Sequence, residues 1–98
     1  MKNYIYTIVY DFPLKNSDNE NINIVTSSNY EYYINLDAGI RALNKTVDIV
    51  KRTIADLNLT IVHESHENVG SPSAFYGIKL KELEKGLGVY LNRLELKD

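Results

Sequence analysis

The segment His63-Glu64-Ser65-His66-Glu67 brings two imidazoles and two carboxylates close together in the chain. Both groups bind divalent metals, and histidine is a natural general base near neutral pH. The zincin pattern His-Glu-x-x-His is not completed, because Glu67 occupies the position of the second histidine. On a strand, His63 and His66 would point to opposite faces, so only a turn after Glu64 could bring them together. The sequence therefore offers a metal site at His63, Glu64, His66 and Glu67, with a solvated strand end as the simpler interpretation.

Tyrosine is the second unusual feature, because the chain has eight tyrosines, two phenylalanines and no tryptophan. Tyrosine is favoured at interfaces since it combines a large rigid surface with a polar tip, although most rings are expected in the core or at its rim. We expect Tyr33 to be exposed, because it shares strand parity with Asn29 and Glu31. The predicted partner-binding residues are Tyr30, Glu31, Tyr32 and Tyr33.

The charge pattern argues against a nucleic-acid ligand. The formal net charge is −2, from 13 acidic and 11 basic residues, and residues 22–36 contain no lysine or arginine. Phosphate-binding surfaces usually carry a basic excess, and base stacking needs interleaved cations. Gly70-Ser71-Pro72-Ser73 has no lysine nearby, so it does not resemble a phosphate-binding loop. We therefore expect no direct contact with nucleic acid.

The length and composition indicate one soluble domain spanning residues 1–98. The 98 residues suffice for one modest core, and 44% of them are hydrophobic. The absence of cysteine excludes disulfides, thiolate catalysis and cysteine-ligated metals. No signal peptide or membrane-spanning stretch is visible, so we expect a cytoplasmic protein without membrane contact or cofactor. The many asparagine, isoleucine, lysine and tyrosine residues have AT-rich codons, which suggests a bacterial or phage genome.

The first half of the chain predicts strands followed by a helix. Residues 3–12 alternate as a central strand does, residues 14–21 are a polar connection, and residues 22–36 form one bulged strand or two short ones. Apolar residues with helical spacing mark an amphipathic helix over 37–57, capped by Asp37. This apolar stripe consists of Ile40, Leu43, Val47, Val50, Ile54 and Leu57. We expect the stripe to pack on the sheet, the alternative being the seam of a homodimer.

The last third of the chain is compatible with two structures. After the helix, which ends at Asn58, we expect a strand over 59–64 and a loop over 65–73. Leucines at helical spacing then favour a short strand over 74–79 and a second helix over 80–94, although Gly86 and Gly88 oppose a helix. The alternative is a hairpin that pairs residues 74–80 with residues 87–96.

These elements predict an α+β fold, with an antiparallel sheet of three to four strands and two helices on one face, in the order β-β-α-β-(β)-α. Without a convincing catalytic constellation, we favour a small binding protein that acts through contact with another protein. The genome style suggests a phage or mobile-element inhibitor of a host defence protein, such as a CRISPR effector. A small metal-binding enzyme or regulator that uses the His63–Glu67 segment is the alternative.

Overall fold

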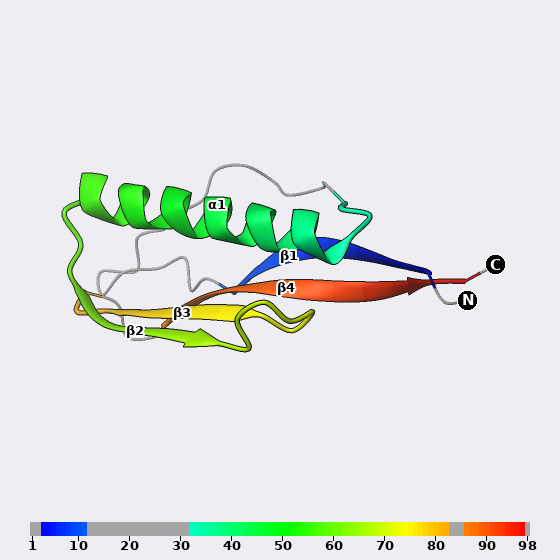
Figure 1. Ribbon diagram of the computed structural model, residues 1–98. Helices are drawn as coiled ribbons and strands as arrows, with labels where there is room; N and C mark the ends of the chain where they lie inside the picture. The colour runs from blue at the N-terminus through cyan, green and yellow to red at the C-terminus, as the bar shows by residue number, and fades with distance from the viewer. Residues whose placement is uncertain (1–2, 12–31, 83–85, 98) are drawn as a thin grey trace.

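Residues 3–11, 32–82 and 86–97 are described by the computed structural model of the chain. They form strand β1 (Asn3–Asp11), helix α1 (Leu36–Asp56), strand β2 (Ile61–Glu67), strand β3 (Phe75–Leu80) and strand β4 (Leu87–Leu96). The four strands form one antiparallel sheet in the order β1-β4-β3-β2, and α1 lies across one face of it (Figure 1). The α+β class with an antiparallel sheet is therefore confirmed. In the part of the chain that the structure describes, there is one helix where two were expected.

The second predicted helix, over residues 80–94, is wrong, and the hairpin alternative is correct. β3 pairs with β4 from Phe75↔Tyr90 to Ile78↔Leu87, and β4 also pairs with β1 from Gly88 to Leu96. Leu87, Val89 and Leu91 alternate toward α1 and are buried, so the same segment also satisfies the period of a strand. Two ladders of backbone hydrogen bonds outweigh a leucine spacing that Gly86 and Gly88 already weaken.

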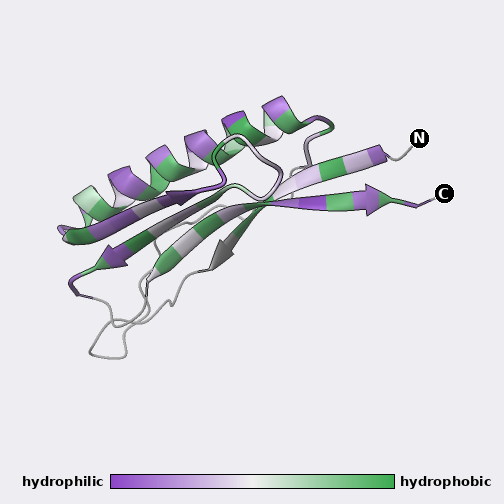
Figure 2. Ribbon diagram, turned by 60° about the horizontal axis from the view of Figure 1, so that its bottom comes forward, coloured by the Kyte–Doolittle hydropathy of each residue, from purple (hydrophilic) through white to green (hydrophobic). Residues whose placement is uncertain are grey.

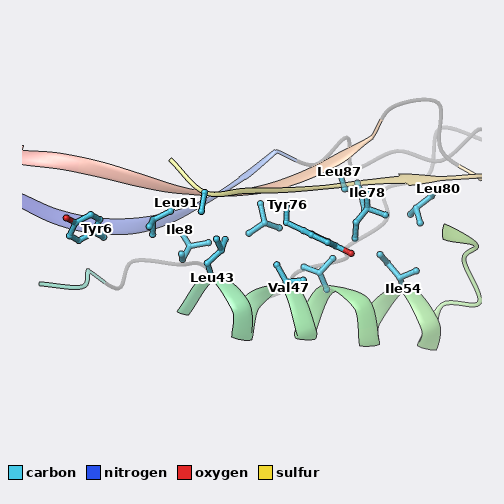
Figure 3. Packing of buried hydrophobic residues seen from close by; sticks show 13 residues of the cluster. Tyr6, Ile8, Leu43, Val47, Ile54, Tyr76, Ile78, Leu80, Leu87 and Leu91 are labelled. Atoms are coloured by element: carbon cyan, nitrogen blue, oxygen red, sulfur yellow. The ribbon is translucent and has the colours of Figure 1, made fainter. Parts of the chain in front are cut away.

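Helix α1 follows the sequence closely, and its apolar stripe faces the sheet. Leu43, Val47, Val50 and Ile54 are buried against the strands, as Figure 3 shows for most of the cluster, so the stripe is not a free dimer seam. The capping prediction was wrong, because the side chain of Asn35, not that of Asp37, accepts the hydrogen bond from Ala38 N at 2.8 Å. Asp37 lies within the first turn, where a negative charge interacts favourably with the helix dipole.

The helix ends as expected, and the next strand runs further than expected. Asn58 has a φ of 57°, the left-handed conformation that stops a helix. β2 then extends from Ile61 to Glu67, whereas the loop was predicted to begin at Ser65. Cross-strand pairs from His63↔Lys79 to Glu67↔Phe75 hold the additional residues in the sheet. The predicted strand over 22–36 lies mostly outside the described residues, except for an isolated bridge between Tyr33 and Tyr6.

The β1 and β4 strands extend beyond the rest of the sheet as a two-stranded ribbon. β3 reaches only Tyr90 of β4, so the remainder of β4, to Leu96, pairs with β1 alone. Both views show this ribbon projecting past the start of α1 toward the chain termini (Figures 1 and 2). Gly39 lets the helix approach the ribbon, because a Cβ there would lie 3.1 Å from both Leu91 Cδ1 and Tyr6 Cβ. The first turn of α1 is thereby placed beside β1.

Candidate functional site

The predicted partner-binding residues divide into exposed, half-buried and undescribed ones. Tyr30 and Glu31 lie outside the described residues. The side chain of Tyr32 is 58% exposed, whereas Tyr33 is half-buried and packs against the core. The expectation that Tyr33 is the exposed ring was therefore wrong. Tyr33 pairs directly with Tyr6 across an antiparallel bridge, and directly opposed residues share a face, so its ring points to the helix side.

A hollow of about 470 Å³ lies between the end of the β1–β4 ribbon and the start of α1. We call it the ribbon-end hollow. Polar and apolar groups share its surface, which is lined by Asn3, Tyr4, Ile5, Tyr6, Ile34, Asn35, Leu36 and Leu96. Ile34 is 82% exposed and Leu96 is 51% exposed, which is unusual for side chains that gain free energy from burial. Folding thus leaves large apolar groups around one concave surface.

The exposure of Ile34 has a local cause in the helix start. Asn35 is the N-cap of α1, so Ile34 is the residue that normally packs against the fourth helical position as a hydrophobic staple. That fourth position is Gly39, which has no side chain to receive it. Tyr6 and Leu91 approach Gly39 closely, because a Cβ there would lie 3.1 Å from an atom of each. The packing of the helix on the ribbon therefore removes the usual partner of Ile34.

Electrostatic contacts at the ribbon end stiffen its helix-facing side. The guanidinium of Arg93 lies 4.4 Å from the centroid of the Tyr4 ring, in a cation–π arrangement. Tyr4 also packs against the buried cluster, so its ring is held on the helix side of the ribbon. The next strand pair toward the termini, Asn3↔Leu96, leaves Leu96 on the opposite face of the sheet. The hollow therefore borders the aromatic ring of Tyr4 on one face of the ribbon and the exposed side chain of Leu96 on the other.

The histidine and glutamate cluster is split by β2. Glu64 and His66 face α1, whereas His63 and Glu67 lie on the other face, because strand residues alternate. Within the described ranges, no group of three or more histidine, cysteine, aspartate or glutamate residues is placed to hold a metal ion. The continuous strand lacks the turn that would bring the two imidazoles together. The geometry gives the metal hypothesis no support.

Glu64 instead belongs to a polar contact between the sheet and the helix. The buried Tyr76 hydroxyl donates a hydrogen bond to Glu64 Oε1 at 2.7 Å, and Lys51 Nζ of α1 lies 3.4 Å from the same oxygen. The Tyr76 hydroxyl lowers the pKa of Glu64, and Lys51 lowers it further. Burial and the neighbouring carboxylate raise the pKa of Tyr76, so its hydroxyl stays protonated. The His66 ring lies 4.5 Å from that of Tyr76, centroid to centroid. These contacts give Glu64 and His66 a structural role in the packing of the sheet against the helix.

Two other concave surfaces enclose smaller volumes than the ribbon-end hollow. One of about 50 Å³ lies between α1 and the loop after β2, beside Val47, His66 and Val69. Another, of about 260 Å³, lies on the sheet face away from α1, with His63, Ser65 and Lys79 along it. Its floor includes Gly77, where a Cβ would lie 2.9 Å from Phe75 Cε1, so glycine is needed to accommodate that ring. Both have smaller volumes than the ribbon-end hollow, and the first is bordered by the exposed Val69.

The residues that line the hollow, including Ile34, Leu36, Leu96 and Tyr4, are not among the partner-binding residues predicted from the sequence. A sequence signal existed for Ile34, since an apolar residue before the N-cap faces a glycine at the fourth helical position. No local signal marks Leu96, because its position at the hollow depends on the register of β4 against β1. The exposed apolar surface is a product of tertiary packing.

Comparison of the chain with protein-family models, curated proteins and solved structures found no match. Among the described residues, no helix is both long and apolar enough to cross a membrane. The candidate function consequently depends on the geometry of the chain alone.

Proposed function

We propose that this chain is a small binding protein that contacts another protein through the ribbon-end hollow. The observation that carries the proposal is the exposure of Ile34 (82%) and Leu96 (51%) around one hollow of about 470 Å³. Contiguous exposed apolar groups on a folded domain mark interaction sites. Tyr32, which precedes Ile34 by two residues and is 58% exposed, is of a residue type that often anchors interfaces.

The charge distribution supports a protein partner. The lining of the hollow contains no lysine, arginine, aspartate or glutamate side chain, whereas nucleic-acid sites carry clustered cations. Interface cores are depleted of charge and enriched in aromatic and aliphatic groups, as this surface is. Inhibition of a host defence protein is the finer form of the proposal, and it is motivated by composition alone.

The test is capture of a partner by tagged protein from a bacterial lysate, with and without nuclease, read by mass spectrometry. The wild-type chain is compared with Ile34→Glu, which places a charge in the hollow, and with Val69→Glu. Val69 is 79% exposed in the loop after β2, so it matches Ile34 in exposure but not in position. A protein enriched by wild type and Val69→Glu, and at least about tenfold less by Ile34→Glu, is expected.

Two results would contradict this proposal. Equal capture by Ile34→Glu and Val69→Glu would exclude the ribbon-end hollow as the contact. Enrichment that disappears on nuclease treatment would show that nucleic acid mediates the contact. The identity of a captured protein would test whether the target belongs to a host defence system. Thermal denaturation of both variants shows that the substitutions leave the domain folded.

A further inference from the structure

The outer edge of β1 is paired at one residue and open at the next outward-facing one. Tyr6 N–H donates to Tyr33 O, and Tyr33 N–H donates to Tyr6 O, both at 2.8 Å. In antiparallel sheets the backbone groups alternate in direction with a period of two residues. The N–H and C=O groups of Tyr4 therefore point to the same outer edge as those of Tyr6. No residue of the described ranges forms a hydrogen bond with these two groups of Tyr4.

The described segment after Tyr33 does not continue along this edge, because it turns into helix α1. Asn35, which would stand opposite Tyr4, is the N-cap. Its carbonyl accepts from Gly39 N at 3.1 Å and its side chain accepts from Ala38 N at 2.8 Å. These helix-start bonds fix the direction in which the chain leaves the sheet. The ribbon-end hollow lies where the strand that contains Tyr33 would otherwise continue.

An open strand edge beside a hollow with apolar side chains at its border favours an extended occupant. Unpaired backbone N–H and C=O groups on an edge are a template for another strand. An extended peptide on such an edge forms main-chain hydrogen bonds and presents alternate side chains to pockets beside it. At this edge, Ile34, Leu36 and Leu96 provide the apolar side chains of the hollow next to Tyr4.

We propose that the partner presents an extended segment that pairs with β1 at Tyr4 and places an apolar side chain in the ribbon-end hollow. This inference rests on the proposed function, and it adds the conformation and chemistry of the bound segment. A second copy of the chain is a poorer occupant, because its own β1 edge at Tyr6 is already paired with Tyr33. Self-pairing of two β1 edges would thus be limited to the residues before Tyr6.

The decisive comparison is Tyr4→Pro against Tyr4→Val. Both variants lose the tyrosine ring and its contact with Arg93, but only proline removes the outward N–H. The β1–β4 ladder keeps its hydrogen bonds, because the amide of Tyr4 does not point toward β4, and proline is tolerated on edge strands. The probe is a set of linear peptides selected from a displayed random library against the wild-type chain. Tyr4→Pro should bind them about tenfold more weakly than Tyr4→Val does.

A second measurement uses only the wild-type chain, so it does not require Tyr4→Pro to fold. Each backbone amide of the best selected peptide is methylated in turn, and its affinity for the wild-type chain is measured. Strand addition predicts that sensitive positions recur with a period of two residues, since alternate amides face the edge. Sensitivity without that period, or equal affinities of Tyr4→Pro and Tyr4→Val, would overturn the inference.

Failure of the inference and failure of the proposed function give different results. If the captured protein depends on Ile34 but the Tyr4 variants bind equally, the partner docks without strand pairing and only the inference fails. If neither the peptides nor the captured protein depends on Ile34, both are wrong. Self-association of the isolated chain that Ile34→Glu abolishes would make a second copy the occupant and would also overturn the inference.

Discussion

The two edge strands of the sheet, β1 and β2, differ in how they meet their surroundings. β2 has a register irregularity between Ile61 and His63 and carries Glu64, His66 and Glu67 along the rest of its length. Bulges and charges discourage pairing with another chain. The described end of β1 instead presents the open backbone of Tyr4 beside apolar groups. The β2 edge is therefore protected against further strands, whereas the β1 edge retains the features of a strand-binding site.

The two edges also differ in how they are attached to helix α1. At β1 the attachment is apolar and close, since Gly39 allows Tyr6 and Leu91 to approach the helix backbone. At β2 it is polar, through Lys51, Glu64 and the hydroxyl of Tyr76 on the neighbouring strand. Apolar close packing and charge-assisted hydrogen bonds respond to different perturbations. Substitutions at the two attachments can therefore separate their contributions.

The largest effect on stability is expected from Gly39→Val. The new side chain would overlap Leu91 and Tyr6, whose atoms lie 3.1 Å from the position of a Cβ, so the helix start must move away from the ribbon. Overpacking of this kind costs about 1–3 kcal/mol of unfolding free energy, measured by urea denaturation. Lys45→Val, at an exposed position of the same helix, is the control and should cost about 0.5 kcal/mol.

Hydrogen exchange would locate the effect of Gly39→Val within the sheet. Faster exchange is expected in β1 and in the part of β4 that pairs only with β1, with β2 less affected. Equal costs for Gly39→Val and Lys45→Val would show that the close approach at Gly39 contributes nothing to the attachment of the helix.

A smaller effect is expected from Glu64→Ala. This change leaves the buried Tyr76 hydroxyl without its acceptor, and an unpaired hydroxyl at that site costs about 1 kcal/mol of unfolding free energy. Glu64→Gln should cost less, because an amide oxygen can still accept. In a Tyr76→Phe background, Glu64→Ala should have almost no effect, which a double-mutant cycle by urea denaturation can measure. Additive costs would show that the two residues do not act together.

The smallest effect is the pH dependence that Glu64 contributes. Its pKa in the folded chain is lowered from the ordinary value of 4.5, mainly by the Tyr76 hydroxyl. The stabilisation by its carboxylate is thus complete above pH 4.5 and is lost as the pH falls through the lower folded-state pKa. The difference in unfolding free energy between wild type and Glu64→Gln should narrow on acidification below that value. A difference that stays constant or widens would contradict the assigned hydrogen bond.

Much of the fold could be predicted because some segments carry one unambiguous period. The apolar spacing from Leu43 to Ile54 fits only a helix, and residues 3–11 alternate as only a strand does. The C-terminal third carries both periods at once, because Leu87 and Leu91 belong to a helical spacing and to a strand alternation. Pairing with β1 and β3 resolves that ambiguity, and neither pairing can be seen from local sequence.

The candidate site was predicted less well, for reasons visible at particular residues. The strand parity that assigned exposure to Tyr33 put Tyr32 with the apolar residues, whereas Tyr32 is the exposed ring and Tyr33 is held by its bridge to Tyr6. The residue types at His63 and His66 suggested chemistry, whereas the continuation of β2 placed them on opposite faces. Residue types identify candidate binding and metal-ligating residues, and the backbone geometry decides which of their side chains lie close together.

The sequence by itself determined the class of the fold, the position of α1, the strand character of β1 and the exclusion of cysteine chemistry. These properties follow from composition and local periodicity, which act over a few neighbouring residues. Only the tertiary structure decided the hairpin of β3 and β4, the separation of the two histidines and the hollow at the ribbon end. Each of these depends on contacts between residues far apart in the chain, such as those of Gly39 with Leu91 and Tyr6. Such contacts exist only after the strands have found their register.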